Sequence, residues 1–238
     1  MSQAARPVFS VVIPVHNEAA YLPEALPLLY RELEDVPATV TVLLAENGST
    51  DGTAELAKRL AAHYPGLGVL ELPAPDYGGA MRDGFLATDG EWAVNFDIDY
   101  FSGRFLHQVL LVGGEADVVL ASKRAPGSDD RRSAFRRVAT WGFNLVLRLL
   151  LQSGVSDTHG IKAVRRKVVE AVAPDVVSTQ DLFDTELVIR AERAGFRIVE
   201  VPVVVEERRQ ARSSLWKRIP RTLRGVWRIR RTLRAERR

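Results

Sequence analysis

The segment EWAVNFDIDYFSG (residues 91–103) contains an apolar run that predicts a buried strand, and the run ends in two aspartates one residue apart. Asp97 and Asp99 repel each other and are costly to desolvate unless a positive charge lies beside them. In an extended segment residues i and i+2 point the same way, so both carboxylates can face one ligand while Ile98 points into the core. The segment therefore predicts a ligand site at the end of a strand, the alternative being a strand end that frays into solvent.

Strand patterns alternate with helix patterns around this segment. Short β-branched and apolar runs predict strands, and apolar residues that repeat every three to four positions predict helices between them. This alternation is typical of the α/β class, with a single doubly wound, mostly parallel sheet flanked by helices. The expected strands are 9–14, 39–46, 67–72, 92–96 and 116–122, and the expected helices are 17–33, 49–64 (capped by Ser49, Thr50 or Asp51) and a segment near 80–87.

Sheets of this kind bind ligands outside the carboxyl ends of their strands. The residues that follow the expected strands are 14–18, 46–51 and 97–99. The chain has neither a GxGxxG after its first strand nor a GxxxxGK[ST] motif, so the usual glycine-rich phosphate cradles are missing. A Mg²⁺ or Mn²⁺ ion held by Asp97 and Asp99 is then the remaining simple way to neutralise a bound diphosphate.

The composition suits one fairly large globular domain. The 238 residues are 46% hydrophobic and 26% charged, and they contain no cysteine and four scattered histidines, which argues against disulfides and against a zinc site. The first residues lack the apolar core of a signal peptide, and no segment has the roughly 18 uninterrupted apolar residues of a membrane span. We therefore expect a cytoplasmic protein.

The charge is divided unevenly along the chain. Residues 216–238 contain ten Lys or Arg and one Glu, so their formal charge is +9. Because the whole chain carries +3, residues 1–215 carry −6. We expect a catalytic domain over 1–215 and a basic amphipathic helix over 216–238 that holds the protein peripherally on the anionic, cytoplasmic face of a membrane. Arginine-rich helices also bind RNA, but the tryptophans favour the membrane, and no nucleic acid is expected. The apolar residues at helical spacing in this segment are Trp216, Ile219, Leu223, Val226, Trp227 and Leu233.

Eight segments occur in an order that resembles a known family. They are VVIPVHNE (11–18), ENGSTDGT (46–53), GGAMRDGFLATDGEW (78–92), FDID (96–99), ASKR (121–124), RRVATWGFN (136–144), SDTHGIKAVRR (156–166) and FDTELVIRAERAGFRIVEVPV (183–203). Together they resemble the family 2 glycosyltransferases of the GT-A fold. Within that family the chain is most similar to the dolichol-phosphate mannosyltransferase and polyprenyl-phosphate glycosyltransferase group.

The resemblance implies a site for a nucleotide-diphosphate sugar. Asp97 and Asp99 would be the DxD pair that binds ribose and the Mg²⁺ or Mn²⁺ ion, and Glu46 stands where the family usually has an aspartate facing the base. Two departures occur nearby: ENGSTD places a neutral Asn47 where the family has an acid, and Ala74 and Asp76 replace an expected asparagine and glycine. The residues implied in donor binding are Pro14, Val15, Asn17, Glu18, Glu46, Asn47, Ser49, Gly78, Arg82, Asp97, Ile98 and Asp99.

The resemblance also implies a polyprenyl phosphate as acceptor. Lys123 falls where the family has an arginine, and RRQARSSL (208–215) matches the family's RxxGxSKL at Arg208 and Ser213. The residues implied in acceptor binding are Arg136, Arg137, Asn144, Lys162, Arg208 and Ser213, and those implied in catalysis are Asp99, Lys123, Arg136, Arg137 and Lys162. The arginines could equally form a solvated helix face, and His16 and His159 are interpreted as polar loop residues.

A lipid phosphate needs no general base, because it is already ionised and can attack the anomeric carbon directly. The expected reaction is a single displacement with inversion, in which the protein aligns the reactants and stabilises the leaving nucleotide diphosphate. A sugar or other hydroxyl acceptor would instead require a base, for which Asp184 and Glu186 are the first candidates. A third possibility, suggested by Asn47 and the altered glycine segment, is a catalytically silent nucleotide-sugar-binding protein. The HNE and STD residues could also serve simply as helix caps.

Overall fold

The computed structural model describes residues 8–122, 125, 127, 129–130, 142, 150–151, 154–155, 160–179, 182–205 and 215–236. Its strands are β1 (Val8–Val15), β2 (Thr39–Asn47), β3 (Leu67–Leu72), β4 (Trp92–Asn95), β5 (Val118–Ser122), β6 (Asp129–Asp130), β7 (Lys162–Arg165), β8 (Ile198–Pro202) and β9 (Val204–Val205). Its helices are α1 (Leu22–Glu34), α2 (Thr53–Ala61), α3 (Tyr77–Ala87), α4 (Gly103–Val112), α6 (Arg166–Val172), the 3₁₀ turn η1 (Ala173–Asp175), α7 (Phe183–Arg193) and α8 (Leu215–Ala235).

One mixed sheet organises the chain, with the strand order β3-β2-β1-β4-β7-β5-β8. β1 pairs in parallel with β2 and β4, β2 with β3, and β5 with β8, whereas β7 is antiparallel to both β4 and β5. β6 and β9 form a separate pair. The predicted single, mostly parallel α/β sheet is confirmed.

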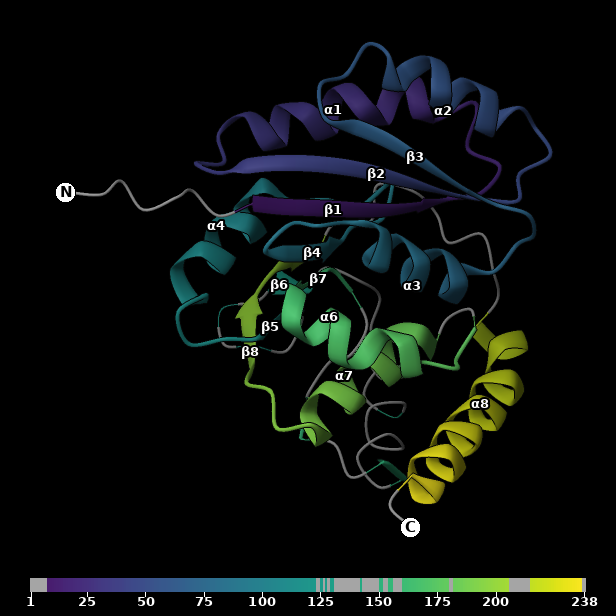
Figure 1. Cartoon of the computed structure of the whole chain (residues 1–238), viewed down its shortest axis with the longest axis vertical. Coiled ribbons are helices and arrows are strands. Elements are labelled where there is room, and N and C mark those ends of the chain that lie inside the picture. The colour runs from purple at the N-terminus through teal and green to yellow at the C-terminus, as the bar shows by residue number, and fades with distance from the viewer. Residues whose placement is uncertain are drawn as a thin grey trace.

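Helices cover both faces of the sheet, because alternate residues of each buried strand point to opposite sides. In β1, Val11 and Ile13 pack into the core on one side and Val12 into the core on the other. Helices α1, α2 and α4 contribute to the first core, and α3, α6 and α7 to the second. Figure 1 shows α1 and α2 on one side of the sheet and α3, α6 and α7 on the other.

The C-terminal helix α8 packs against α7 (Figure 1). A small apolar cluster, the α7–α8 cluster, joins them; its buried members are Leu151, Leu182, Ile189, Val226, Ile229 and Leu233. Val226 and Leu233, two of the apolar residues at helical spacing in this segment, are thus buried against the domain. Trp227 points the other way and is 61% exposed. Within the described residues, no helix is both long and apolar enough to cross a bilayer.

Several element boundaries differ from the prediction, most of all the start of α1, which begins at Leu22 and not at residue 17. Helix α2 begins at Thr53 after Gly52, which has a positive φ of 84°, so Gly52 and not Ser49, Thr50 or Asp51 holds the cap position. Asp51 still contributes, because its carboxylate accepts hydrogen bonds from the Thr53 amide and hydroxyl. β4 ends at Asn95, one residue earlier than expected, because a tight turn follows at 97–100.

Candidate active site

The predicted site segments meet at one edge of the sheet. β1, β2 and β4 run in parallel, so their carboxyl ends at Val15, Asn47 and Asn95 lie on the same side. β7 runs the opposite way, and its first residue, Lys162, lies directly opposite Asn95. The edge therefore collects polar residues from four strands or their following loops, as the doubly wound topology requires.

Side chains from the β2–α2 segment accept hydrogen bonds from the backbone amides that follow β1. The amides of Asn17, Glu18 and Ala19 donate to Ser49 Oγ, Thr53 Oγ1 and Asp51 Oδ2 at 2.9, 2.9 and 3.1 Å. Asn17 has a left-handed φ of 54°, which asparagine tolerates, and its Oδ1 accepts the Thr50 amide at 2.9 Å. These amides are thus committed within the protein and do not form a phosphate cradle, as the absence of a glycine-rich motif predicted.

The exposed carboxylate of Asp51 accepts hydrogen bonds from both loops. The Thr53 hydroxyl, followed by the Ala19 and Thr53 amides, lowers the pKa of Asp51. His16 also bridges the two loops, since its Nδ1 lies 2.7 Å from the Asn47 carbonyl oxygen. His16 therefore fits the expected role of a polar loop residue.

Glu46 and Asn47, at the end of β2, are both buried. Glu46 Oε1 accepts the Ser49 amide at 2.6 Å, and Asn47 Oδ1 accepts the Asp76 amide at 2.6 Å. Asn47 thereby ties the end of β2 to the residue that precedes α3. The adjoining Gly48 has a φ of 63°, and a Cβ there would lie 2.8 Å from the Ala74 carbonyl carbon, so the loops approach as closely as only glycine permits.

The aspartate pair lies in a tight turn and not in an extended strand. The Asp97 amide donates to the Tyr100 carbonyl, and the Tyr100 amide donates to the Asp97 carbonyl, each at 3.0 Å. Ile98 is buried, whereas Asp97 and Asp99 are half-buried. Ile98 is therefore buried between two partly exposed aspartates, as expected. A turn closed by the two reciprocal hydrogen bonds produces this pattern, and not an extended strand.

Lys162 is completely buried beneath this turn. Its Nζ donates to Asp184 Oδ1 at 2.7 Å, to the Gly160 carbonyl at 2.7 Å and to Asn95 Oδ1 at 3.2 Å. An ammonium group has three N–H donors, so these three acceptors use all of them. The structure thus places Lys162 inside the protein, where direct contact with an acceptor phosphate would require the network to break.

Tyr77, the first residue of α3, joins the same network. Its hydroxyl donates to Asp184 Oδ2 at 3.0 Å, so both oxygens of Asp184 accept hydrogen bonds from buried donors. The ring is half-buried but the hydroxyl is enclosed, and this burial, with the nearby charges of Asp184 and Asp97, holds the pKa of Tyr77 well above its usual value. Tyr77 therefore remains a hydrogen-bond donor close to Asp97.

Glu186 belongs to a different buried network on α7. Its carboxylate accepts hydrogen bonds from the Ser178 amide at 2.8 Å and from Arg190 Nε at 2.8 Å. Arg190 in turn binds both carboxylate oxygens of Glu236, at the end of α8, at 3.0 Å. Glu186 thus anchors the α7–α8 contact.

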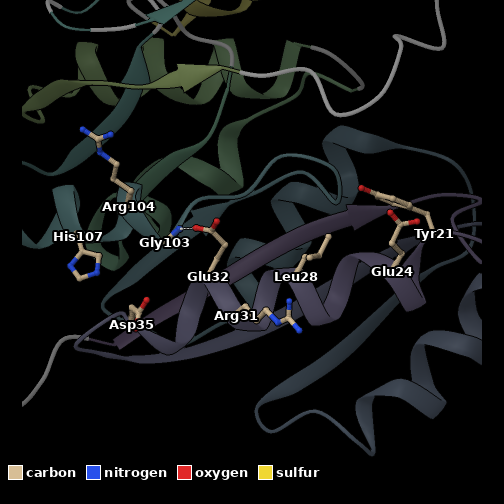
Figure 2. Close-up of a pocket in the computed structure, with 9 residues that line it drawn as sticks. All are labelled: Tyr21, Glu24, Leu28, Arg31, Glu32, Asp35, Gly103, Arg104 and His107. Carbon is tan, nitrogen blue, oxygen red and sulfur yellow. Dashed lines mark hydrogen bonds between the residues drawn. The ribbon is translucent and has the colours of Figure 1, made fainter.

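A surface groove of about 900 Å³ runs between α1 and α4 (Figure 2). Glu32 lies in it and accepts the Gly103 amide at 3.0 Å, which fixes the start of α4 just after the aspartate turn. A Cβ at Gly103 would clash with the Glu32 carbonyl oxygen, so glycine is required for this contact. The predicted site residues lie outside the groove lining, which comprises Tyr21, Glu24, Leu28, Arg31, Glu32, Asp35, Gly103, Arg104 and His107.

Comparison with models of known protein families identifies the family to which the chain belongs. The model of the family described as Glycosyl transferase family 2 matches residues 10–173, more than half of the chain. The chain belongs to glycosyl transferase family 2. The matched region includes the turn with Asp97 and Asp99 and the Lys162 strand, so the family membership covers most of the polar edge described above.

Two curated relatives extend this comparison. Glycosyltransferase AglD of Haloferax volcanii is 35% identical over 206 residues, which cover 82% of this chain and 32% of that protein. The chain therefore spans about a third of the length of this relative. The undecaprenyl-phosphate mannosyltransferase of Micrococcus luteus is 31% identical over 212 residues, covering 86% of each chain.

A solved enzyme structure shows the same fold. Glucosyl-3-phosphoglycerate synthase from Mycobacterium tuberculosis, solved with Mn²⁺, UDP and glucosyl-3-phosphoglycerate, superposes with a TM-score of 0.67 at 21% identity. The match covers 94% of this chain and 78% of that structure. The predicted GT-A fold is thereby confirmed.

The remaining predicted donor residues lie at or near the same edge. Pro14 and Val15 end β1, and Gly78 is buried in the first turn of α3. Arg82, one turn further along α3, pairs with its neighbour Asp83 at 2.8 Å. The other predicted acceptor and catalytic residues lie outside the described residues; they are Lys123, Arg136, Arg137, Asn144, Arg208 and Ser213.

Sequence reasoning missed Tyr77 and Asn95 as members of the site. Asn95 carried a signal, because it is a polar residue in the otherwise apolar run WAVNF. Tyr77 carried none, since its partner Asp184 is 107 residues away along the chain. Asp184 was considered only as a base, whereas the structure pairs it with Lys162.

Proposed function

We propose that the chain transfers a sugar, with inversion, from a nucleotide-diphosphate sugar to a polyprenyl phosphate, at a site that uses Mg²⁺ or Mn²⁺. Membership of glycosyl transferase family 2 supports the transfer, and the similarity to an undecaprenyl-phosphate mannosyltransferase over 86% of each chain supports the acceptor. The activity proposed is that of the region spanned by this sequence.

The proposed acceptor, a phosphate and not a hydroxyl group, rests on the hydrogen bonds of Asp184 and Glu186. A hydroxyl acceptor needs a base that can take its proton. Both oxygens of Asp184 are bound by Lys162 and Tyr77, and Glu186 is sealed between Arg190 and the Ser178 amide. Neither carboxylate is placed to act as a base, so the geometry favours an acceptor that is already ionised, such as a phosphate.

The aspartate turn fits a divalent cation of the hard type. Such ions prefer oxygen ligands and often take one or two carboxylates together with substrate phosphate oxygens. Asp97 and Asp99 are half-buried on one turn, and the described residues contain no third clustered acidic or histidine ligand. Asp97 and Asp99 would therefore hold the ion, with the diphosphate completing its ligands, and the bound ion would neutralise charge that develops on the leaving nucleotide.

The protein's own contribution is chiefly alignment. The β1–α1 and β2–α2 loops are cross-linked by four hydrogen bonds, which join Asn17, Glu18 and Ala19 to Ser49, Thr50, Asp51 and Thr53. A rigid loop pair of this kind holds the nucleoside end of the donor in place. The phosphate acceptor then attacks from the opposite face of the sugar ring in a single displacement, which inverts the anomeric centre.

We further propose that the exposed face of α8 binds the anionic cytoplasmic leaflet of a membrane. Arg228, Arg231 and Arg234 lie on this face with Trp227, opposite the residues buried in the α7–α8 cluster. Basic residues near an anionic leaflet contribute about 1 kcal/mol each, and tryptophan favours the interface. This surface would bring the site to a lipid-linked acceptor without a membrane span from this part of the chain.

The reaction is tested with radiolabelled guanosine- and uridine-diphosphate sugars, each offered undecaprenyl phosphate in anionic vesicles or a water-soluble alcohol or sugar. The expected result is Mn²⁺- or Mg²⁺-dependent transfer of label to the lipid phase. Efficient glycosylation of the free hydroxyl acceptors, with lipid phosphate ignored, would overturn the proposed acceptor. Binding of nucleotide sugar without any transfer would instead support a silent binding protein.

A further inference from the structure

We propose that Lys162 is a positioning residue for Asp97, and that it acts through the side-chain amide of Asn95. The inference rests on the proposed function, in which Asp97 and Asp99 hold the divalent cation. It assigns Lys162 a role beneath the site and not at the substrate, and it adds Asn95 to the residues on which cation binding depends.

The chemistry of Lys162 fixes the orientation of the Asn95 amide. An ammonium group can only donate hydrogen bonds, so the oxygen of the amide must face it. Asn95 Oδ1 lies 3.2 Å from Lys162 Nζ, and the amide nitrogen consequently points the other way. There it lies 3.5 Å from the carbonyl oxygen of Phe96 and 3.6 Å from Met81 Sδ.

The Phe96 carbonyl belongs to the peptide unit that leads directly into Asp97. A side-chain amide held at this carbonyl restrains the rotation of that peptide, and so the direction in which the Asp97 carboxylate leaves the chain. On its other side the turn is closed by the reciprocal hydrogen bonds between Asp97 and Tyr100. Asp97 is therefore fixed from both sides, by the turn and by the Lys162–Asn95 contact.

Lys162 is itself held by groups from outside the strand pair. Asp184 Oδ1 in α7 and the Gly160 carbonyl each lie 2.7 Å from Nζ, and the Tyr77 hydroxyl of α3 fixes the other oxygen of Asp184. The side chain of Lys162 has no exposed surface. Four elements (α3, β4, β7 and α7) thus set the position of one ammonium group, and an ion pair so enclosed confers geometry more readily than stability.

The test measures the affinity of UDP and GDP by calorimetry, with Mn²⁺ and with EDTA, for wild type and for three variants. Lys162→Met removes the ammonium, and Asn95→Ala removes the amide while leaving the Lys162–Asp184 pair in place. The matched control is Arg190→Met, which breaks another buried ion pair of α7 that makes no contact with Asn95. The readout is the ratio of the affinities with and without Mn²⁺, because partial unfolding lowers both values equally and leaves the ratio unchanged.

The expected result is a ratio about tenfold lower in Lys162→Met and in Asn95→Ala, as is typical when a group supporting a metal ligand is lost. Arg190→Met keeps the wild-type ratio even if its melting temperature falls. If Lys162→Met does not fold, Asn95→Ala alone decides the question. A clear Mn²⁺ effect in wild type that persists unchanged in the folded variants would overturn this inference alone, whereas no Mn²⁺ effect in wild type would overturn the cation site as well.

Discussion

Gly225 of α8 lies so close to Leu182 that a Cβ at position 225 would clash with Leu182 Cδ1. Leu182 caps the start of α7, two residues before Asp184, so the C-terminal helix supports the part of α7 that reaches the site. Removal of α8 would uncover Leu182 and Ile189 and leave Arg190 without Glu236. Helix α8 is therefore better studied by point substitution than by truncation.

We predict that Gly225→Val destabilises the protein. The added side chain has no room beside buried Leu182, and such overpacking typically costs about 1–3 kcal/mol. Thermal unfolding should show a lower midpoint, and limited proteolysis should cut α8 more readily. Gly114→Val is the control, because nothing lies within 4 Å of a Cβ at that position. Equal stability of the two variants would mean that α8 does not pack closely on α7.

We predict that the triple variant Arg228→Gln, Arg231→Gln, Arg234→Gln binds anionic vesicles more weakly. At about 1 kcal/mol per basic residue, three neutralised arginines lower the partition coefficient by roughly 100-fold at low salt. Vesicle co-sedimentation measures it, and the wild-type binding should itself weaken with added salt as the Debye length shortens.

The control for membrane binding has the same change in charge elsewhere. Arg31, Arg59 and Arg104 are exposed residues of α1, α2 and α4, and their replacement by glutamine should leave vesicle binding almost unchanged. If both triple variants lose binding equally, net charge and not the α8 face attracts the membrane.

We predict that Asp99→Asn lowers turnover strongly but preserves the fold. The half-buried carboxylate contributes one ligand charge, and its loss should lower kcat by roughly 100-fold or more, as for other groups that stabilise charge in a transition state. Circular dichroism and the melting temperature should match wild type, because Asp99 lies on the turn and outside the core. Activity within a fewfold of wild type at saturating Mn²⁺ would contradict a metal role for this residue.

We predict that Lys162 and Asp184 show strong energetic coupling. Lys162→Met or Asp184→Leu leaves one charge buried and unpaired, which should lower the free energy of unfolding by about 3–5 kcal/mol. The double variant replaces both charges by apolar groups and should lose much less than the sum. Urea denaturation of the wild type, the two single variants and the double variant measures this coupling. If the losses in unfolding free energy are additive, the two side chains do not form the buried pair seen here.

The control for this cycle is an exposed ion pair. Lys58 and Glu71 lie 2.8 Å apart, but their side chains are 54% and 45% exposed. Water screens such a pair, so Lys58→Met should change the unfolding midpoint very little.

The sequence by itself determined most of the elements and the polar edge of the sheet. The alternation of apolar runs predicted β1 to β4 within one or two residues, because side-chain periodicity is a local property of the chain. Asp97 and Asp99 were also predicted locally, since two aspartates at the end of an apolar strand are costly without a cation. Even the turn that replaced the expected extended segment kept Ile98 inside and both carboxylates partly exposed.

Only the tertiary structure decided what the charged and amphipathic residues contact. Lys162 and Asp184 are 22 residues apart in sequence, and nothing local shows that their charges meet in the core and remove Lys162 from the substrate side. The apolar stripe of α8 likewise fits either a lipid surface or a protein surface, because both offer the same apolar environment. The packing of Val226, Ile229 and Leu233 on α7 assigns that stripe to the protein and leaves Trp227 and the arginines facing outward.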